Sequence, residues 1–197
     1  MGLGITKLFR KLQISWNVNE FSIRKKLLGF ENANAFLRRL DKNSMIPILK
    51  KYGSSIGIDC DIESPLLFHN CLDYSNLIVG NNCHIGKNCF FDLRSKVQID
   101  ENVVISMQST FITHQDMNKS GLKAIYPATT KAIHIKENCY IGTGVTILQG
   151  VQLGESSVIA AGSIVTKNVE PYTMVGGVPA KFIKALPNIE KHQEDAV

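Results

Sequence analysis

The sequence has no apolar run that approaches the roughly 20 residues needed to cross a bilayer. Its first ten residues also lack the uninterrupted apolar core of a signal peptide, because Lys7 and Arg10 fall among them. No RNA- or DNA-binding motif accompanies the basic residues, so nucleic acid is not expected as a partner. These absences lead us to expect a cytoplasmic protein that is at most peripheral to the inner face of the membrane.

One column of aliphatic residues recurs every six positions through the second half of the chain. Its members are Ile135, Ile141, Ile147, Leu153, Ile159 and Val165. A helix repeats its apolar face every 3.6 residues and a strand every 2, so a period of six is typical of neither. Such a period is expected of a stacked parallel β-coil built from short repeats.

Two companion columns support this prediction. Three positions after each anchor stand mostly Gly or Asn, which most easily adopt a left-handed corner conformation: Asn138, Gly144, Gly150, Ser156, Gly162 and Asn168. Two positions before each anchor stand small or aliphatic residues, which suit a narrow interior: Ile133, Cys139, Val145, Val151, Ser157 and Ser163. Antiparallel hairpins are the alternative, but they do not require Gly and Asn at one fixed phase.

The same register extends backwards through the chain with interruptions. Further anchors are Val79, Ile85, Phe91, Ile99, Ile105 and Phe111, with Asn82, Asn88 and Asn102 at corners. The spacing from Phe91 to Ile99 is eight, which predicts a two-residue insertion bulging from a corner near residues 93–97. A weaker run, Ile56, Ile62, Phe68 and Tyr74, predicts an opening coil that caps the stack.

Cysteine placement agrees with this arrangement. Four of the five cysteines fall on the small inward column, namely Cys60, Cys83, Cys89 and Cys139. A reduced thiol behaves there as a compact hydrophobe, so a disulfide framework is not expected.

Residues 1–30 carry six basic residues and one acidic residue, Glu20. The net charge of this segment therefore equals the formal net charge of the whole chain, +5. The basic residues are Lys7, Arg10, Lys11, Arg24, Lys25 and Lys26. Interleaved apolar residues predict a helical region. In one interpretation this helical region packs on the coil or on a neighbouring subunit and keeps its basic face in solvent. In the other it attaches to an anionic membrane surface or to a lipid-linked substrate.

A second helical stretch is predicted over residues 34–50, with Phe36, Leu37 and Leu40 as its apolar stripe and Pro47 as a break near its end. The coil register then halts over residues 113–130, whose irregular polar composition is typical of a binding loop. We therefore divide the chain into a basic helical segment (1–54), a β-helix (55–170) with a protruding loop (113–132), and a C-terminal extension (171–197).

Three runs carry a resemblance to a known family. They are Ile141-Gly142-Thr143-Gly144-Val145-Thr146-Ile147, Val158-Ile159-Ala160-Ala161-Gly162-Ser163-Ile164-Val165-Thr166-Lys167 and Val175-Gly176-Gly177-Val178-Pro179-Ala180-Lys181. Residues 75–185 resemble the hexapeptide-repeat acyltransferases of the maltose, galactoside and polysaccharide O-acetyltransferase kind. The resemblance implies an all-β fold, the left-handed parallel β-helix, an exception to the usual right-handed crossover.

The resemblance also implies a function. Family enzymes are homotrimers that hold acetyl-CoA in the groove between neighbouring prisms, and His114 matches their catalytic loop histidine. An imidazole can remove the proton of a sugar hydroxyl as that hydroxyl attacks the thioester. We therefore expect an acetyl-CoA-dependent sugar O-acetyltransferase of cell-surface polysaccharide biosynthesis that transfers the acetyl group directly, without an acyl-enzyme.

Further site residues follow from the same resemblance. Gly142, Thr143, Ala160 and Ala161 would border the pantetheine, Thr166 and Lys167 would meet the nucleotide, and Lys181 and Lys184 would pair with phosphates. Asp92 and Tyr140 are expected at the acceptor. The family usually has Asn at the position of Asp92, which could instead orient His114 across a subunit interface or bond its own backbone.

The remaining histidines, His69, His84, His134 and His192, are expected to be exposed to solvent. Two alternatives stay open. A γ-type carbonic anhydrase would need a further loop histidine for zinc, which is not present near His114, so no metal is expected. A non-catalytic β-helix scaffold is the other alternative.

Overall fold

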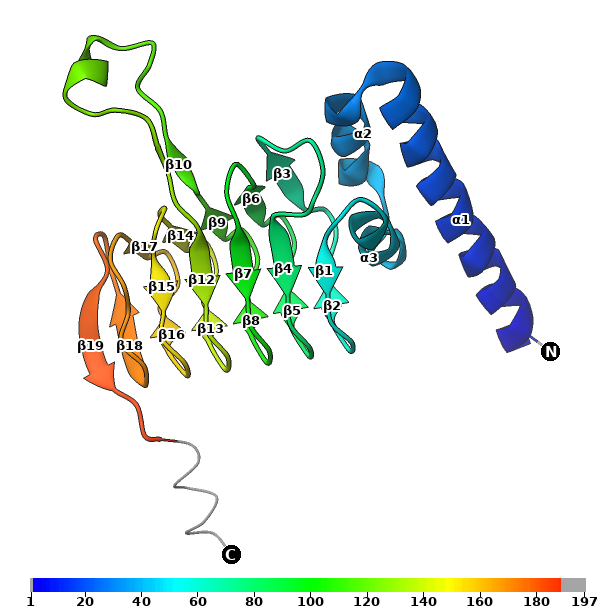
Figure 1. Ribbon diagram of the computed structural model, residues 1–197. Helices are drawn as coiled ribbons and strands as arrows, with labels where there is room; N and C mark the ends of the chain where they lie inside the picture. Colours follow the sequence, from blue (N-terminus) through cyan, green and yellow to red (C-terminus); the bar gives the residue numbers. More distant parts are fainter. Residues whose placement is uncertain (1, 189–197) are drawn as a thin grey trace, which may run out of the picture.

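The computed structural model describes residues 2–188, with side chains from residue 5 onward. Three sheets wind together into a left-handed parallel β-helix, and a group of helices lies at its N-terminal end (Figure 1). The hexapeptide prediction is confirmed.

Each turn of the β-helix contributes one strand to each of three sheets. Sheet A contains β1 (Ser55–Ile56), β4 (Leu77–Val79), β7 (Val97–Ile99), β12 (Ile133–Ile135) and β15 (Gln152–Leu153). Sheet B contains β2 (Asp61–Ile62), β5 (His84–Ile85), β8 (Val104–Ile105), β13 (Tyr140–Ile141), β16 (Val158–Ile159), β18 (Thr173–Gly176) and the antiparallel β19 (Lys181–Ala185). Sheet C contains β3 (Leu67–His69), β6 (Phe90–Asp92), β9 (Thr110–Phe111), β14 (Thr146–Ile147) and β17 (Ile164–Val165).

The predicted corner residues adopt the left-handed conformation with one exception. Positive φ angles occur at Asn82, Asn88, Asn102, Asn138, Gly144, Gly150, Ser156 and Gly162. Asn168 does not share this conformation, and its assignment as a corner was wrong. There the chain leaves the regular repeat, and the Asn168 side chain accepts a hydrogen bond from the Gln152 amide at 2.9 Å instead.

The anchor column forms the core, and Ile135, Ile141 and Ile147 are completely buried. In the first three strands of sheet C, β3, β6 and β9, the anchors are aromatic and form a ladder of rings. The ring centroids of Phe68 and Phe91 lie 5.7 Å apart and those of Phe91 and Phe111 lie 4.8 Å apart.

Two predictions about the opening coil and the cysteines need correction. Tyr74 is buried, but it lies outside any strand, packs on Phe30 and Phe68, and so joins the helices to the ladder instead of anchoring a strand. Cys60 is only partly buried because the first coil has no β-coil beyond it. Cys83, Cys89 and Cys139 are buried as expected, and burial raises the pKa of Cys89 to about 11.

The helical end consists of α1 (Gly2–Leu28), α2 (Phe30–Phe36), the 3₁₀ helix η1 (Leu37–Arg39) and α3 (Lys42–Lys51). The stretch predicted over residues 34–50 is therefore broken at Leu40 and Asp41, not at Pro47. The Asp41 side chain starts α3 by accepting a hydrogen bond from the Asn43 amide at 2.9 Å. Pro47 lies inside α3, where its nitrogen has no hydrogen and cannot donate a helical hydrogen bond.

None of the described helices is long and apolar enough to span a membrane.

All three insertions leave the β-helix at the corner between sheet C and sheet A, which we call the C–A corner. They connect β3 to β4, β6 to β7 and β9 to β12. The last is the longest and carries the hairpin of β10 (His114–Gln115) and β11 (Thr129–Thr130), with the 3₁₀ helix η2 (Gly121–Ala124) at its far end (Figure 1). Stacking thus brings residues from three separate loops together at one corner.

Candidate active site

The C–A corner brings His114 and Asp92 into direct contact. Nδ1 of His114 lies 2.6 Å from Oδ2 of Asp92. The Asp92 side chain is 1% exposed, whereas that of His114 is 22% exposed. When Asp92 is ionised, it holds the proton of the neutral ring on Nδ1 and leaves the lone pair on Nε2. One ring nitrogen is thereby oriented and the other is available as a base.

Three further amide donors surround the buried Asp92 carboxylate, one of them the Arg94 amide at 3.4 Å from Oδ1. The Thr113 amide donates to Oδ2 at 2.9 Å and Asn70 Nδ2 donates to Oδ1 at 3.0 Å. Burial alone would raise the pKa of Asp92, but hydrogen bonds from His114, Asn70 and Thr113 outweigh it and lower that pKa to about 2. Asp92 is therefore a carboxylate at neutral pH.

Arg94 forms an outer layer around this pair. Its guanidinium lies 3.3 Å from Asp116 Oδ2 and 3.4 Å from Asn70 Oδ1. Arg94 therefore connects the first insertion to the start of the long loop that carries His114.

Asn70, Arg94, Thr113 and Asp116 were not among the predicted site residues. One signal in the sequence could have identified them: each lies within five positions after Phe68, Phe91 or Phe111, the aromatic anchors that precede the three insertions.

The alternative in which Asp92 orients His114 applies within one chain and not across an interface, because both residues belong to the same chain. Within one chain the stacked coils already place them side by side.

The residues predicted to border pantetheine gather at the opposite edge of sheet C, at the corner between sheets B and C. The Gly162 amide donates to the Thr143 carbonyl at 2.8 Å, and a Cβ at Gly142 would come within 2.6 Å of the Ala161 nitrogen. The backbones of adjacent coils therefore touch at this corner. His114 lies at the C–A corner, with sheet C between it and this surface.

Thr166 and Lys167 follow β17 and lie at the C–A corner, two coils beyond His114. Lys181 and Lys184 are exposed on β19, the last strand of sheet B. Lys181 on β19 lies opposite Gly176 on the neighbouring strand β18. A Cβ added to Gly176 would lie 2.9 Å from the Ala160 Cβ. Thus β18 lies between Ala160 and β19, the strand that carries Lys181.

Tyr140 lies on β13 of sheet B and is 45% exposed. Its hydroxyl is 3.3 Å from Ser106 Oγ. Sheet B is the face opposite the C–A corner, so one chain does not bring Tyr140 to His114.

Two of the other histidines are paired instead of simply solvated. Nε2 of His134 lies 2.8 Å from Asp100 Oδ2, and Nδ1 of His84 lies 3.2 Å from Asp61 Oδ2. His69 lies near Phe90, with ring centroids 6.1 Å apart, and His192 is outside the described residues. Within residues 2–188, no three His, Cys, Asp or Glu side chains gather as a metal site.

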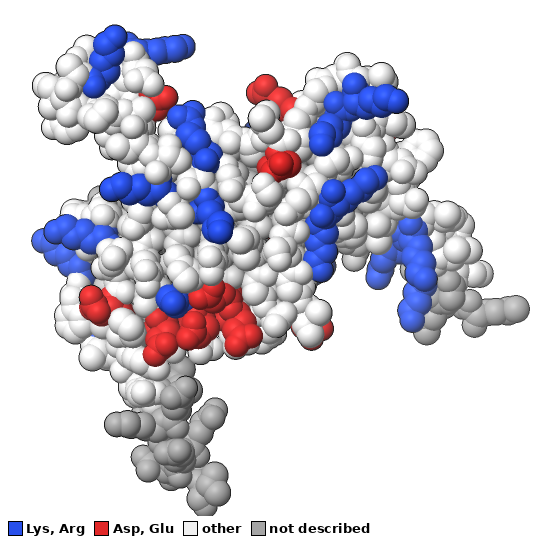
Figure 2. All heavy atoms as spheres, in the orientation of Figure 1, with Lys and Arg blue, Asp and Glu red and all other residues white. Residues whose placement is uncertain are grey.

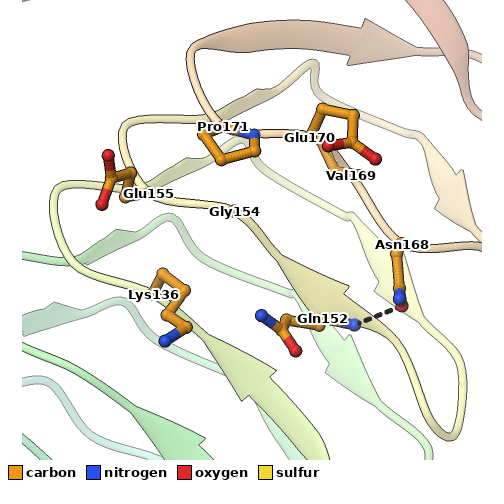
Figure 3. A pocket seen from close by; sticks show the side chains of 8 residues that line it. All are labelled: Lys136, Gln152, Gly154, Glu155, Asn168, Val169, Glu170 and Pro171. Carbon is orange, nitrogen blue, oxygen red and sulfur yellow. Dashed lines mark hydrogen bonds between the residues drawn. The ribbon is translucent and has the colours of Figure 1, made fainter.

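Several hollows lie outside the His114–Asp92 pair, and two of them differ in how they relate to it. Figure 3 shows a polar pocket near the C-terminal end of the β-helix, lined by Lys136, Gln152, Glu155 and Glu170 among others, and no predicted site residue lines it. A second pocket lies between the helices and the C–A corner, and Leu28, Arg38, His69 and Asn70 are among its lining residues. The second pocket adjoins the dyad, because Asn70 donates to Asp92.

Comparisons with known proteins agree with this architecture. Residues 132–167 match the family model "Bacterial transferase hexapeptide (six repeats)", and residues 76–107 match "Hexapeptide repeat of succinyl-transferase". The chain is 29% identical to the galactoside O-acetyltransferase of Escherichia coli (strain K12), over 88% of this chain and 83% of the relative.

Two further relatives complete the comparison. An acetyltransferase homologue from Saccharomyces cerevisiae is 30% identical over 74% of this chain and 73% of its own length. A crystal structure of a galactoside acetyltransferase in complex with coenzyme A superimposes with a TM-score of 0.70 at 26% identity, and covers 88% of this chain and 84% of that chain. From repeat, fold and relatives together, the chain belongs to the hexapeptide-repeat left-handed β-helix acyltransferase family and is an acetyltransferase.

Proposed function

We propose that the protein transfers an acetyl group from acetyl-CoA to a sugar hydroxyl, with His114 as the general base. The observation that carries this proposal is the dyad: a buried, ionised Asp92 orients a partly exposed His114 at 2.6 Å. The galactoside O-acetyltransferase of Escherichia coli supports a sugar acceptor, and the coenzyme A complex of the related enzyme supports acetyl-CoA as the donor.

The proposed reaction needs one proton relay and no covalent enzyme intermediate. Nε2 of His114 takes the hydroxyl proton while the hydroxyl oxygen forms a bond to the thioester carbonyl carbon. The carbon–sulfur bond then breaks, and the imidazolium returns the proton to the departing thiolate. Asp92 stabilises the imidazolium during this step and holds the ring in place.

We further propose that the active enzyme is a homotrimer. Sheet C separates His114 from Gly142, Thr143, Ala160 and Ala161 within one chain. A groove between two chains would bring the C–A corner of one to the pantetheine surface of the next, and Tyr140 could wall the acceptor there. In this arrangement Thr166 and Lys167 meet the nucleotide, and Lys181 and Lys184 pair with phosphates as point charges.

A role in cell-surface polysaccharide biosynthesis in the cytoplasm completes the proposal. It is supported by the sugar-directed relatives and by the absence of a spanning helix among residues 2–188.

The decisive experiment measures free thiol release from acetyl-CoA with a panel of mono- and oligosaccharides. We expect release that depends on one class of sugar acceptor and produces an acetyl ester detectable by mass spectrometry. Absence of release with every sugar, together with intact fold, would favour the scaffold alternative. Stoichiometric zinc and hydration of carbon dioxide would instead favour the carbonic anhydrase alternative.

A further inference from the structure

The α1 helix carries an apolar stripe that its own chain does not cover. The stripe consists of seven large side chains that are each more than half exposed: Ile5, Leu8, Phe9, Leu12, Trp16, Ile23 and Leu27. They recur at helical spacing, so they lie on one face of the helix. Trp16 and Leu27, both 72% exposed, are the most exposed members.

The opposite face of α1 contacts the rest of the molecule. Phe21 is completely buried, Asn17 donates to Ser44 at 2.9 Å, and the Tyr52 hydroxyl lies 2.8 Å from Ser22. Phe21 and Leu12 lie about 180° apart around the helix axis at 3.6 residues per turn. The helix therefore packs through one face and turns its apolar stripe away from the described body.

Charge determines which partner suits this stripe. All six basic residues of residues 1–30 lie on α1, whereas its acidic residue, Glu20, is paired with Arg24 at 2.7 Å. Most acidic side chains visible in Figure 2 gather over the lower part of the β-helix, away from α1. Two α1 helices packed stripe to stripe would bring strongly basic segments together, whereas an anionic surface would neutralise them.

We propose that α1 is an interfacial helix that lies in the surface of an anionic membrane. Its apolar stripe, which includes Phe9 and Trp16, enters the headgroup region, while the exposed basic side chains of α1 meet the lipid phosphates. These are Lys7, Arg10, Lys11 and Lys26, whereas Arg24 and Lys25 contact the body of the protein. The helix is too polar to span the bilayer, which agrees with a position in the interface plane.

The end of α1 connects this surface to the active site. Leu28, its last residue, lines the pocket that extends to Asn70, and Asn70 donates to Asp92.

The chain supplies its own probe, because Trp16 is its single tryptophan. The full-length protein is titrated with vesicles of phosphatidylcholine alone or with added phosphatidylglycerol, and tryptophan emission is recorded alongside co-sedimentation. We expect a shift to shorter wavelength and sedimentation with the anionic vesicles only. The emission shift and the sedimentation should both weaken at high salt, because counterions screen the attraction between surface charges, which already extends only about 10 Å at moderate salt.

Two variants separate the apolar and the charged contributions. Phe9→Ser should weaken vesicle binding by about tenfold or more, the factor for burying one large apolar side chain. Lys7→Gln combined with Lys11→Gln should remove the preference for anionic lipid. The matched controls are Ile58→Ser, which replaces a residue 69% exposed outside α1, and Lys87→Gln combined with Lys136→Gln on the β-helix.

Either of two results would overturn the proposal. One is unchanged Trp16 emission and no sedimentation with anionic vesicles. The other is an emission shift that grows with protein concentration without lipid and is abolished by Phe9→Ser, which would show that the stripe pairs with another copy of the chain. Thiol release with a soluble sugar is measured in parallel and should be unaffected by Phe9→Ser, so this test is independent of the proposed reaction.

Discussion

At the scale of single residues, the site depends on how Asp92 and His114 share one hydrogen bond. Asp92 is almost completely buried and receives donors from three loops, whereas His114 keeps an exposed edge. In the proposed mechanism this difference gives the two residues different parts: His114 meets the substrate, and Asp92 acts through it as a positioning residue.

Replacing His114 with Ala should lower acetyl transfer by about 100-fold or more, the lower end of what a positioned general base contributes. The fold should survive, because His114 lies outside the six-residue register and its loss opens no core cavity. Thiol-release kinetics and thermal unfolding check the two parts. Full activity in the variant would show that His114 is not the base.

Replacing Asp92 with Asn keeps the shape but removes the charge that stabilises the imidazolium. We expect a lower kcat, an unchanged KM for acetyl-CoA, and an acid limb of the pH–rate profile that moves to lower pH. An Asp92→Glu variant that restores part of kcat would support the role of the charge. If Asp92→Asn has a normal kcat and a normal pH–rate profile, Asp92 has only a structural role at the C–A corner.

Asp92 should also make stability depend on pH. Its pKa is lowered from 3.8 to about 2 in the folded protein, so the ionised form stabilises the fold fully above pH 3.8. That contribution is lost as the pH falls through about 2. The free energy of unfolding in urea is measured for the unchanged protein and for Asp92→Asn at several pH values. Any excess stability of the unchanged protein should shrink as the pH falls from 3.8 to about 2. A constant difference would contradict the lowered pKa of Asp92.

At the scale of elements, the aromatic ladder of sheet C supports the corner from which the site loops depart. Phe68, Phe91 and Phe111 each end a turn of the β-helix immediately before an insertion. Their stacking therefore sets the spacing between the loops that carry Asn70, Asp92 and His114.

Phe91→Ala should destabilise the protein by roughly 3–5 kcal/mol, the usual cost of a large cavity in a core. Phe91 is completely buried between two rings, so the neighbouring coils cannot close the gap without moving the strands. Phe90→Ala is the matched control, since Phe90 is only partly buried and should cost about 1 kcal/mol. Equal losses in denaturant unfolding would show that the ladder has no special role.

At the scale of the whole molecule, the proposed site is divided between two corners, so the proposed mechanism needs neighbouring chains. We expect light scattering at micromolar concentration to give three times the mass of one chain. An active monomer would contradict the shared groove, because a single chain keeps His114 and the pantetheine surface on opposite edges of sheet C.

The sequence determined the repeat, the core and the main catalytic candidates. The six-residue period identifies the buried side chain in the short strands of the regular coils, because each repeat places its anchor at the same phase. Residues such as Ile141 and corners such as Asn102 could therefore be assigned without coordinates. The family resemblance added His114 as the catalytic candidate and Asp92 as an acceptor candidate that could also orient it.

Only the tertiary structure decided which parts meet. Insertions of unequal length separate Asn70, Asp92 and His114 along the chain, and only stacking of complete turns brings them to one corner. The misassigned residues have the same origin: Tyr74 has the phase of an anchor but packs beneath α2, and Pro47 lies inside a helix that begins at Lys42. For α1, periodicity shows an apolar helix, but contacts such as that of Asn17 with Ser44 decide which face it buries. Local periodicity specifies how each residue lies in its own turn, whereas contacts between turns depend on every insertion that precedes them.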